Sequence, residues 1–437
     1  MTKTFITLTP EEFDTFARKS PISHFQQTTA WANLKAINGW KAHFVGVKEK
    51  DTIVAASLIL EKPLPLGRSM FYAPRGPLLD YKNKSLLEFF VKNIKAYAKQ
   101  HHAIFFKIDP EIVNIERDQD GNPLKDGENN SDIVTSLKKL GFKHHGFNIE
   151  GNIAPQYTFV LNLNGRTEDE LFANFDGNHR TKLRKNEKNH VAIRKMTFEE
   201  LSIYKDITTH TADRRGFEDR PLSYYQEMWK ALGDNLVIYL ATVDLNQYID
   251  TINAEKASKD AEKANLEKLL EKASHKEKIE RKIANVDKDL AELEKRLKHT
   301  KNCLKSADKD GILNLGASMF VKTDREITSL FGGAYGEYRE FNAAYSLNWE
   351  IIKFAAKNGY QKYNFYGISE FKDPKSPTYG LYYFKRGFGG QVEEYIGEFD
   401  LVVSKFWYLG YKLAYELPKS IRRHKNNRKY AQSTKKK

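Results

Sequence analysis

Apolar residues recur at helical spacing in some segments of the chain and form short continuous runs in others. Segments 86–100 and 344–359 place apolar side chains three and four residues apart, which predicts amphipathic helices. Each is followed by a run rich in aromatic and branched residues, 103–110 and 362–369, which predicts a strand. The alternation of helices and strands predicts a fold of the α/β or α+β class.

The same order of elements occurs twice along the chain. In both halves a helix and a strand are followed by a polar loop, a second helix with a lysine, a Gly-Phe pair and another strand. The passage Lys138–Phe142 in the first half corresponds to Lys385–Phe388 in the second. This repeat indicates two copies of one α/β unit, in an order that resembles the acetyltransferase-type (GNAT-like) fold. Neither half has the R/Q-x-x-G-x-G/A loop for a pyrophosphate, which disfavours acetyl-CoA as a substrate.

The segment from about residue 251 to residue 310 contains no Gly, no Pro and no aromatic residue. Its second half repeats apolar residues at spacings of 4, 3, 4, 3, 4 and 7, which is the a/d pattern of a coiled coil. These residues are Ile279, Ile283, Val286, Leu290, Leu293, Leu297 and Leu304. Its charges are nearly balanced, with about sixteen positive and thirteen negative residues, so most of its surface is expected to be a solvated helical face.

The first half of this segment is less regular and leaves its register open. One register is formed by Ile252, Leu266, Leu269 and Ala273, and a second by Ala254, Ala257, Ala261 and Ala264. Small residues at 273–275 offer a point of reversal, and the flanking runs 235–244 and 312–321 are both typical of strands. An antiparallel hairpin about 40 Å long is therefore favoured over one continuous helix that pairs with a second copy.

Composition limits the classes of protein to which the chain can belong. Its 437 residues correspond to about two to three domains, and 40% hydrophobic residues suffice for a sizeable core. The net charge of +14 indicates an anionic partner, such as nucleic acid, a phosphorylated substrate or an acidic membrane surface. No apolar run reaches the length of a membrane span, and the N-terminus has no signal-peptide core. We expect a soluble, cytoplasmic protein.

Motifs of several common enzyme classes are missing. The sequence has no H-E-x-x-H, G-x-S-x-G or G-x-x-x-x-G-K-[ST] motif. The single cysteine, Cys303, excludes a disulfide framework and lies in the helical segment without a catalytic partner. The histidine pairs at 101–102 and 144–145 show no metal-binding spacing. We therefore expect neither a bound metal nor a cofactor.

Basic residues gather in two places. Within the stretch 179–190, which is expected to begin a helix, lie Arg180, Lys182, Arg184 and Lys185. The stretch 418–437 carries nine Lys or Arg residues and no acidic residue. Such clusters can bind phosphates of RNA or of lipid head groups, although a tail that only adds solubility has the same composition.

Four single residues stand out by their position. Asp109 ends a predicted strand, where a half-buried carboxylate can act as a base, although an Asp before Pro is also a common turn former. Lys385 lies between aromatic residues and glycines, which allow backbone to approach its ammonium. Arg220 and Tyr224 flank Pro221, which is expected to open a helix, so both can reach an anion near its N-terminus.

These passages resemble the Fem-type (FemABX) family of peptidyltransferases, which build the interpeptide bridges of Gram-positive peptidoglycan with aminoacyl-tRNA as donor. The resemblance covers nearly the whole chain and is most specific at 331–369 and at YYFKRGFGGQVEEYIGEFD. Further matching passages are SHFQQTTAWANLK, YAPRGPLLDY, FKIDP, LKKLGFKHHGF, FVLNL, RTKLRKNEK and FEDRPLSYY. The helical segment resembles the arm of the FemA-like branch, and FemA-like and MurM-like enzymes act on lipid-linked precursor.

The resemblance implies two GNAT-like subdomains in one globular unit, with the acceptor's phosphates in a cleft between them. We expect the first subdomain at 1–160, the second at 161–246 and 312–400, the arm at 247–311, and a C-terminal helix with the basic tail at 401–437. The implied reaction transfers an amino acid from aminoacyl-tRNA to the stem-peptide lysine, or to the growing bridge, of lipid-linked precursor (lipid II). The implied location is cytoplasmic, with peripheral contact at the inner membrane face.

The resemblance also assigns the acceptor side of this reaction. Lys35 and Arg220 would bind the acceptor diphosphate, with Tyr224 assisting. Asp109 would line the site of the acceptor amine, where its carboxylate would orient the ammonium and could take its proton. Whether Asp109 or a hydroxyl of the tRNA is the general base stays open.

On the donor side, Lys385 and Phe384 would meet the aminoacyl ester and the terminal adenosine of the tRNA. A further family tyrosine near the second-half strand is assigned to Tyr335. The ester is already activated, so the enzyme must only align the amine, remove a proton and stabilise an oxyanion. Two alternatives stay open, namely a coiled-coil RNA-binding or scaffold protein and a CoA-dependent N-acyltransferase.

Overall fold

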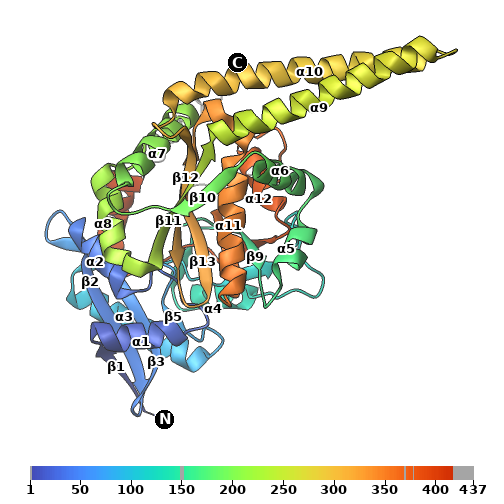
Figure 1. Ribbon diagram of the computed structural model, residues 1–437. Coiled ribbons are helices and arrows are strands. Elements are labelled where there is room, and N and C mark those ends of the chain that lie inside the picture. Colours follow the sequence, from blue (N-terminus) through green and yellow to red (C-terminus); the bar gives the residue numbers. More distant parts are fainter. Residues whose placement is uncertain (1, 148–151, 369–370, 377, 417–437) are drawn as a thin grey trace.

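The computed structural model describes residues 2–147, 152–368, 371–376 and 378–416, which form two mixed sheets covered by helices (Figure 1). The first sheet has the order β1-β2-β3-β4-β6-β16-β8, with β5 paired to β3. Its strands are β1 (Lys3–Thr7), β2 (Lys41–Glu49), β3 (Thr52–Leu64), β4 (Arg68–Ala73), β5 (Leu78–Leu79), β6 (Ala103–Ile108), β8 (Phe142–His144) and β16 (Phe399–Val402). The predicted strand at 103–110 is β6.

The second sheet has the order β10-β11-β12-β13-β14-β9-β15-β7. Its strands are β7 (Val113–Glu116), β9 (Tyr157–Asn162), β10 (Val191–Lys195), β11 (Leu236–Asp244), β12 (Ile312–Lys322), β13 (Glu326–Ala334), β14 (Lys362–Gly367) and β15 (Gln391–Tyr395). The predicted strand at 362–369 is β14, which runs parallel to β13 and places Lys362 beside Glu326. The predicted fold class, mixed α/β with two units, is confirmed.

The two halves of the chain exchange strands. β7 comes from the first half but pairs with β15, whereas β16 comes from the second half and pairs with β6 and β8. β9 begins at Tyr157 and lies wholly in the second sheet, so a boundary at residue 160 falls inside a strand. Each exchanged strand pairs its backbone with strands of the other half. The division into subdomains stays a proposal, and these exchanged strands refine it.

The helices lie on both sheets, and the long predicted ones at 86–100 and 344–359 are α3 and α11. Their bounds are α1 (Pro10–Lys19), α2 (Thr29–Ile37), α3 (Lys84–Gln100), α4 (Ser131–Lys139), α5 (Glu168–Asn174), α6 (Gly177–Lys188), α7 (Leu201–Arg215), α8 (Leu222–Leu232), α11 (Ala343–Lys357), α12 (Tyr379–Arg386) and α13 (Lys405–Tyr411). One core cluster draws on both halves, with Phe13 and Leu58 in contact with the group that holds Tyr204 and Met319. This shared core joins the halves into one globular unit.

A helical arm projects from the second half (Figure 1) and consists of α9 (Leu245–Lys272) and α10 (Glu277–Cys303). The two helices pack against each other as the predicted hairpin, and the chain reverses at 273–276. All seven residues of the predicted seam on α10 are buried or half-buried. Burial raises the pKa of the Cys303 thiol at the base of the arm, which disfavours the reactive thiolate.

Of the two registers left open for α9, the alanine register is wrong, because Ala254, Ala257, Ala261 and Ala264 are all exposed. In the other register Ile252, Leu266 and Ala273 are buried or half-buried, but Leu269 is 50% exposed, whereas its neighbour Leu270 is half-buried. The inner edge of α9 also carries lysines that pair with acids of α10. These pairs are Lys256–Glu294 at 2.8 Å, Lys259–Asp289 at 2.9 Å and Lys263–Asp287 at 2.7 Å. Because ion pairs replace part of the apolar seam, the apolar residues of α9 alone do not define its register. Among the described residues, no helix is both long and apolar enough to cross a membrane.

Candidate active site

Three of the residues predicted to bind an anion line one pocket of about 340 Å³, namely Lys35, Arg220 and Tyr224. Lys35 lies in the last turn of α2, where its ammonium is 4.5 Å from the ring centre of Trp31. Burial and then the charge of Arg220 lower the pKa of Lys35. Two cations that repel each other in a partly buried pocket are a suitable site for a doubly charged anion.

The segment before α8 fixes the other wall of this pocket. Asp219 holds it to α7, because its carboxylate accepts hydrogen bonds from Lys205, Thr208 and Tyr225. α8 begins directly after Pro221, as the sequence predicts, so Arg220 lies just ahead of the helix. The Arg220 guanidinium is 5.3 Å from the ring centre of Tyr224. The pocket therefore lies at the junction of the two halves.

Asp109 follows β6 and is buried, with 3% of its surface exposed. Its carboxylate accepts one hydrogen bond from the Tyr72 hydroxyl at 2.7 Å and one from the Arg75 backbone N–H at 2.7 Å. Burial raises the pKa of Asp109 to about 7, although Arg75 opposes this rise. A carboxyl group that titrates near neutral pH suits proton transfer.

Arg75 is a central residue that the sequence analysis did not single out. Its side chain is buried, pairs with Glu111 at 3.1 Å, and donates to the Pro155 carbonyl at 2.9 Å. Its guanidinium is 4.4 Å from the ring centre of Tyr395. Arg75 stands in the passage YAPRGPLLDY, so its motif was visible, but its burial beside Asp109 was not.

Lys385 lies in the last turn of α12 and is buried, with 7% exposed. Its ammonium donates to the backbone carbonyls of Tyr366 at 3.2 Å and Gly367 at 2.7 Å. No carboxylate among the described residues pairs with it, and burial lowers the pKa of Lys385 to about 7. A buried ammonium without a counter-ion is costly, and such groups concentrate at functional sites.

A chain of contacts links Lys385 to Asp109. Gly367, which accepts from Lys385, lies against Pro155 so closely that a Cβ there would be 2.8 Å from the proline ring. The carbonyl of Pro155 accepts from Arg75, whose backbone N–H donates to Asp109. The structure thus brings the two predicted catalytic residues to the same region.

Tyr366 connects this region to the anion pocket. Its backbone has φ +65°, a strained value for a non-glycine residue. Burial raises the pKa of its hydroxyl to about 12, and the charges of Arg75, Asp109 and Tyr224 act on it. Its backbone carbonyl accepts from Lys385, and the sequence analysis did not single Tyr366 out.

Tyr335, which the sequence analysis assigned near the donor, lies elsewhere. It follows β13, and its hydroxyl donates to Asp206 on α7 at 2.5 Å. Burial and this hydrogen bond raise its pKa. Within the described parts of the chain, no contact joins Tyr335 to Phe384 or Lys385. The role of Tyr335 stays a prediction, and Tyr366, near the end of β14, is the tyrosine whose carbonyl accepts from Lys385.

Phe384 packs beside the basic helix α6. Its ring is 4.9 Å from that of Tyr345 at right angles, and its carbonyl accepts from the ring of His179 at 2.9 Å. Gly387 permits this approach, because a Cβ there would lie 1.9 Å from an atom of the His179 ring. Lys182 of α6 donates to the Tyr345 hydroxyl at 2.7 Å. The basic helix therefore adjoins the helix that carries Lys385.

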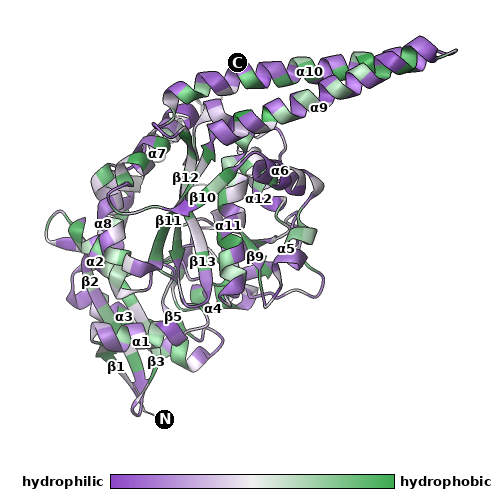
Figure 2. Ribbon diagram, viewed as in Figure 1, coloured by the Kyte–Doolittle hydropathy of each residue, from purple (hydrophilic) through white to green (hydrophobic). Residues whose placement is uncertain are grey.

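The predicted basic residues of α6 divide into two groups. Arg180 caps the preceding helix by donating to the Ala173 and Phe175 carbonyls at 2.7 and 2.5 Å. Arg184 and Lys185 are exposed, and Figure 2 shows α6 as strongly hydrophilic. Together with Lys182 these exposed side chains offer positive charge beside Phe384. The basic stretch 418–437 lies outside the described residues.

A larger cavity of about 690 Å³ lies on the other side of Arg75 and is lined by Glu111, Tyr395 and Lys362, among others. Lys362 there pairs with Glu326 at 3.0 Å and with Glu393 at 3.2 Å. Lys362 is therefore already paired with acids. The smaller pocket instead brings together Lys35 and Arg220, with Glu227 as the acid in its lining.

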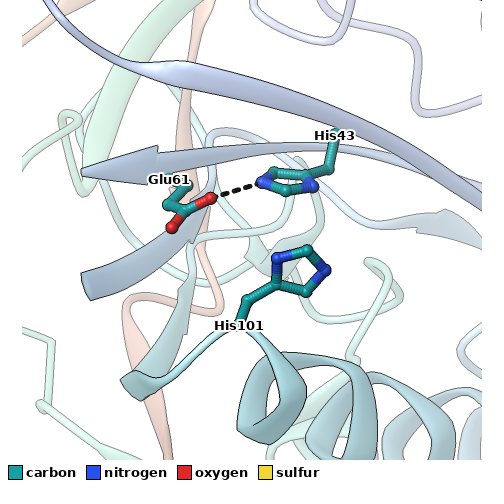
Figure 3. Close-up of side chains that lie close together, drawn as sticks. All are labelled: His43, Glu61 and His101. Carbon is teal, nitrogen blue, oxygen red and sulfur yellow. Dashed lines mark hydrogen bonds and ion pairs between the residues drawn. The ribbon is translucent and has the colours of Figure 1, made fainter. Parts of the chain in front are cut away.

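One histidine of the pair 101–102 joins a cluster that the sequence did not reveal (Figure 3). The ring of His43 bonds to Glu61 at 2.7 Å and to the Tyr97 hydroxyl at 2.9 Å, and the His101 ring meets it edge to face with the ring centres 4.8 Å apart. His43, Glu61 and His101 each offer a ring nitrogen or a carboxylate oxygen of the kind that binds metals, and these atoms lie within 4.8 Å of one another. They come from β2, β3 and the end of α3, so only the sheet pairing brings them together. This network ties α3 to the sheet.

Comparisons with known proteins show the family of this chain. The model of the FemAB family matches residues 8–416. Aminoacyltransferase FemA of Staphylococcus epidermidis is 31% identical over 424 residues, covering 95% of this chain and 100% of the relative. Its counterpart from Staphylococcus aureus is 30% identical over 413 residues, with 93% and 97% covered. The crystal structure of FemX superposes with a TM-score of 0.73 at 27% identity, covering 95% of this chain and 100% of that one. The chain belongs to the FemAB family, which the sequence motifs had indicated.

Proposed function

We propose that this protein transfers an amino acid from aminoacyl-tRNA to the stem-peptide lysine amine, or to the growing bridge, of lipid-linked peptidoglycan precursor. It is an aminoacyltransferase of the FemA type, which adds amino acids to peptidoglycan precursors to form interpeptide bridges. The observation that carries the finer proposal is the arrangement around Tyr366. Its backbone carbonyl accepts from the buried ammonium of Lys385, and its hydroxyl is within electrostatic range of the buried carboxyl group of Asp109 and of Tyr224, which lines the cationic pocket.

The cationic pocket would hold the diphosphate of the acceptor. Lys35 and Arg220 repel each other, so a bound diphosphate would relieve the repulsion and form charge-assisted hydrogen bonds with both. Tyr224 lines this pocket beside Arg220 and would assist in holding the diphosphate. An acceptor held here would lie close to Asp109.

Asp109 would act on the acceptor amine. A lysine ammonium has a pKa of about 10.4 and must lose a proton before it can attack. With a pKa of about 7, Asp109 can accept that proton at neutral pH. The amine then forms a C–N bond to the ester carbonyl, the ester C–O bond breaks, and the ribose oxygen of the tRNA leaves with a proton.

Lys385 would stabilise the oxyanion that develops during this attack. Its ammonium is held by two carbonyl oxygens rather than by a carboxylate, so its charge is not neutralised before the ester binds. A fixed donor at an oxyanion contributes about 10²–10³ in rate. The ester already carries the free energy for amide formation, so neither ATP nor coenzyme A is required.

The tRNA would approach along α6. Lys182, Arg184 and Lys185 supply positive charge beside Phe384, whose ring offers a stacking surface for the terminal adenosine. We place the reaction at the cytoplasmic face of the membrane, because a lipid-linked acceptor is anchored there and charged tRNA is cytoplasmic.

The test offers the full-length protein a mixed pool of charged tRNAs together with lipid-linked precursor and determines the product by mass. We expect the precursor to gain the mass of one or more Gly, Ala or Ser residues. Uncharged tRNA and acetyl-CoA serve as controls and should give no product. An unchanged precursor with every charged tRNA, or acetylation by acetyl-CoA, would contradict the proposal.

A further inference from the structure

Exposed apolar side chains gather in one short segment of the first-sheet side of the molecule. Of thirteen large apolar residues exposed among the described ones, four lie within 406–415. Phe406 is 78% exposed, Leu409 62% and Leu413 57%. They belong to α13 and to the helical turn η4 (Lys412–Glu416) that continues it. Their spacing of three and four residues places them on one face of the helix.

The opposite face of the same segment is anchored to the sheet. The Tyr408 hydroxyl donates to Asp400 at 2.7 Å, and the Tyr411 ring is 5.0 Å from that of Phe105. Trp407 lies under the guanidinium of Arg68 at 4.7 Å. The segment is therefore held in a defined orientation, and its outward face is a fixed feature of the surface.

Basic residues occur within this segment, beside it and in the sequence that follows it. Lys405 and Lys412 lie within the segment, and Arg68 lies beside it. The following residues, 417–437, carry nine Lys or Arg residues and no acid, so Glu416 is the only acid from residue 405 onward. An apolar stripe on an amphipathic helix with a cationic surround is the chemistry that binds an anionic lipid surface.

The segment that carries this stripe of Phe406, Leu409 and Leu413 is linked to the proposed acceptor pocket through Trp40. Trp40 lines that pocket together with Lys35 and Arg220. The same Trp40 packs against the cluster under α13 that holds Tyr72 and Tyr408. A tryptophan between an apolar surface and a polar pocket is typical of the membrane interface. If the proposed function holds, the lipid tail of the acceptor would leave the pocket beside this stripe.

We propose that Phe406, Leu409 and Leu413 insert into an anionic lipid bilayer and dock the enzyme on the membrane that holds its acceptor. The stripe lies in the interface plane and does not cross the bilayer. Lys405, Lys412 and the basic stretch that follows supply electrostatic attraction, whereas the three apolar side chains supply insertion.

The test measures the affinity of the full-length protein for vesicles of phosphatidylethanolamine and phosphatidylglycerol by flotation. The variant Leu409→Ser/Leu413→Ser should bind about tenfold more weakly, because two apolar side chains no longer enter the bilayer. The matched control Leu124→Ser/Leu269→Ser changes two exposed leucines elsewhere and should bind like wild type. High salt should weaken all forms by a similar factor, since it screens only the cationic part.

Two results would overturn the proposal. One is an unchanged affinity of the stripe variant for these vesicles, and the other is self-association by light scattering that the stripe variant abolishes, which would assign the stripe to a second copy. Vesicle binding does not depend on transfer. A stripe variant that no longer floats with vesicles, but still transfers to a lipid-free soluble acceptor, supports docking. Wild-type protein that floats with vesicles but does not transfer overturns only the proposed function.

Discussion

Two buried lysines, Lys107 and Lys385, differ in what surrounds their ammonium groups. Lys107 is 6% exposed and lies on β6, two residues before Asp109, while Lys385 is 7% exposed on α12. Lys107 pairs with Asp400 at 2.8 Å and with Glu398 at 3.3 Å. Among the described residues, Lys385 donates to the carbonyls of Tyr366 and Gly367 and pairs with no carboxylate. The two side chains are equally buried, but within that part of the chain only Lys107 has a carboxylate partner.

This difference separates a structural charge from a functional one. Burial alone would lower the pKa of Lys107, but Asp400 and Glu398 hold it above its ordinary value. Burial acts without opposition on Lys385 and lowers its pKa to about 7. Lys107 therefore contributes to the fold through its ion pairs, whereas Lys385 destabilises the fold and is available to a substrate.

The largest expected effect is on catalysis. Lys385→Met should lower kcat/KM for transfer by about 10²–10³-fold, because the oxyanion loses its fixed cation. The fold should be kept, as circular dichroism can verify. Lys107→Met is the matched control and should change transfer only in proportion to the folded fraction. Near-normal turnover by Lys385→Met would remove it from the catalytic site.

The second effect is on stability and has opposite signs at the two positions. Lys107→Met should lower the free energy of unfolding by about 3 kcal/mol, because the buried carboxylates of Glu398 and Asp400 lose their lysine and Asp400 keeps only the His145 ring, 2.8 Å away, as a basic partner. Lys385→Met should raise it at pH 7, because a buried unpaired charge is removed. Urea denaturation measures both. Equal losses at both positions would contradict the distinction between the two lysines.

The third effect is the pH dependence of that stability difference. The folded pKa of Lys385, about 7, is below its ordinary value of 10.5, so the unfolded chain binds more protons between these pH values. Wild-type stability therefore rises with pH in this window. The free energy of unfolding of Lys385→Met should exceed that of wild type by about 2 kcal/mol less at pH 9 than at pH 7. A constant advantage would mean that Lys385 does not titrate in this range.

The smallest effect concerns acceptor binding. Arg220→Ala should weaken binding of the lipid-linked acceptor about tenfold and change kcat little, because one charge-assisted contact to the diphosphate is lost. Arg215→Ala, at the exposed end of α7, is the matched control. An acceptor affinity that Arg220→Ala leaves unchanged would exclude Arg220 from the diphosphate site.

Local patterns predicted much of the fold, and long-range pairing was beyond them. The helices α3 and α11 and the seam of α10 follow from apolar spacing within a few turns. The strand exchange depends on β15 meeting β7, whose residues Glu393 and Glu116 are far apart in sequence. The register of α9 failed at Leu269, because lysines that pair across the arm occupy part of its inner edge.

Site residues that belong to a recognisable motif could be predicted from the sequence. Residues whose role depends on their three-dimensional surroundings could not. Lys35, Arg220 and Tyr224 were identified from their motifs, and the structure places them in one pocket. Arg75 and Tyr366 were missed, because their importance comes from burial, a positive φ and backbone contacts. Such properties arise only when the two halves pack together.

The most direct test of this account is the pKa of Lys385 itself. Protein labelled with ¹³C at the lysine Cε positions can be titrated by NMR, and the Lys385 signal is identified by its absence from Lys385→Met. The account predicts a midpoint near pH 7, with Lys107 still charged at pH 10. A Lys385 midpoint above pH 10 would show a neutralised, structural lysine and would contradict the account.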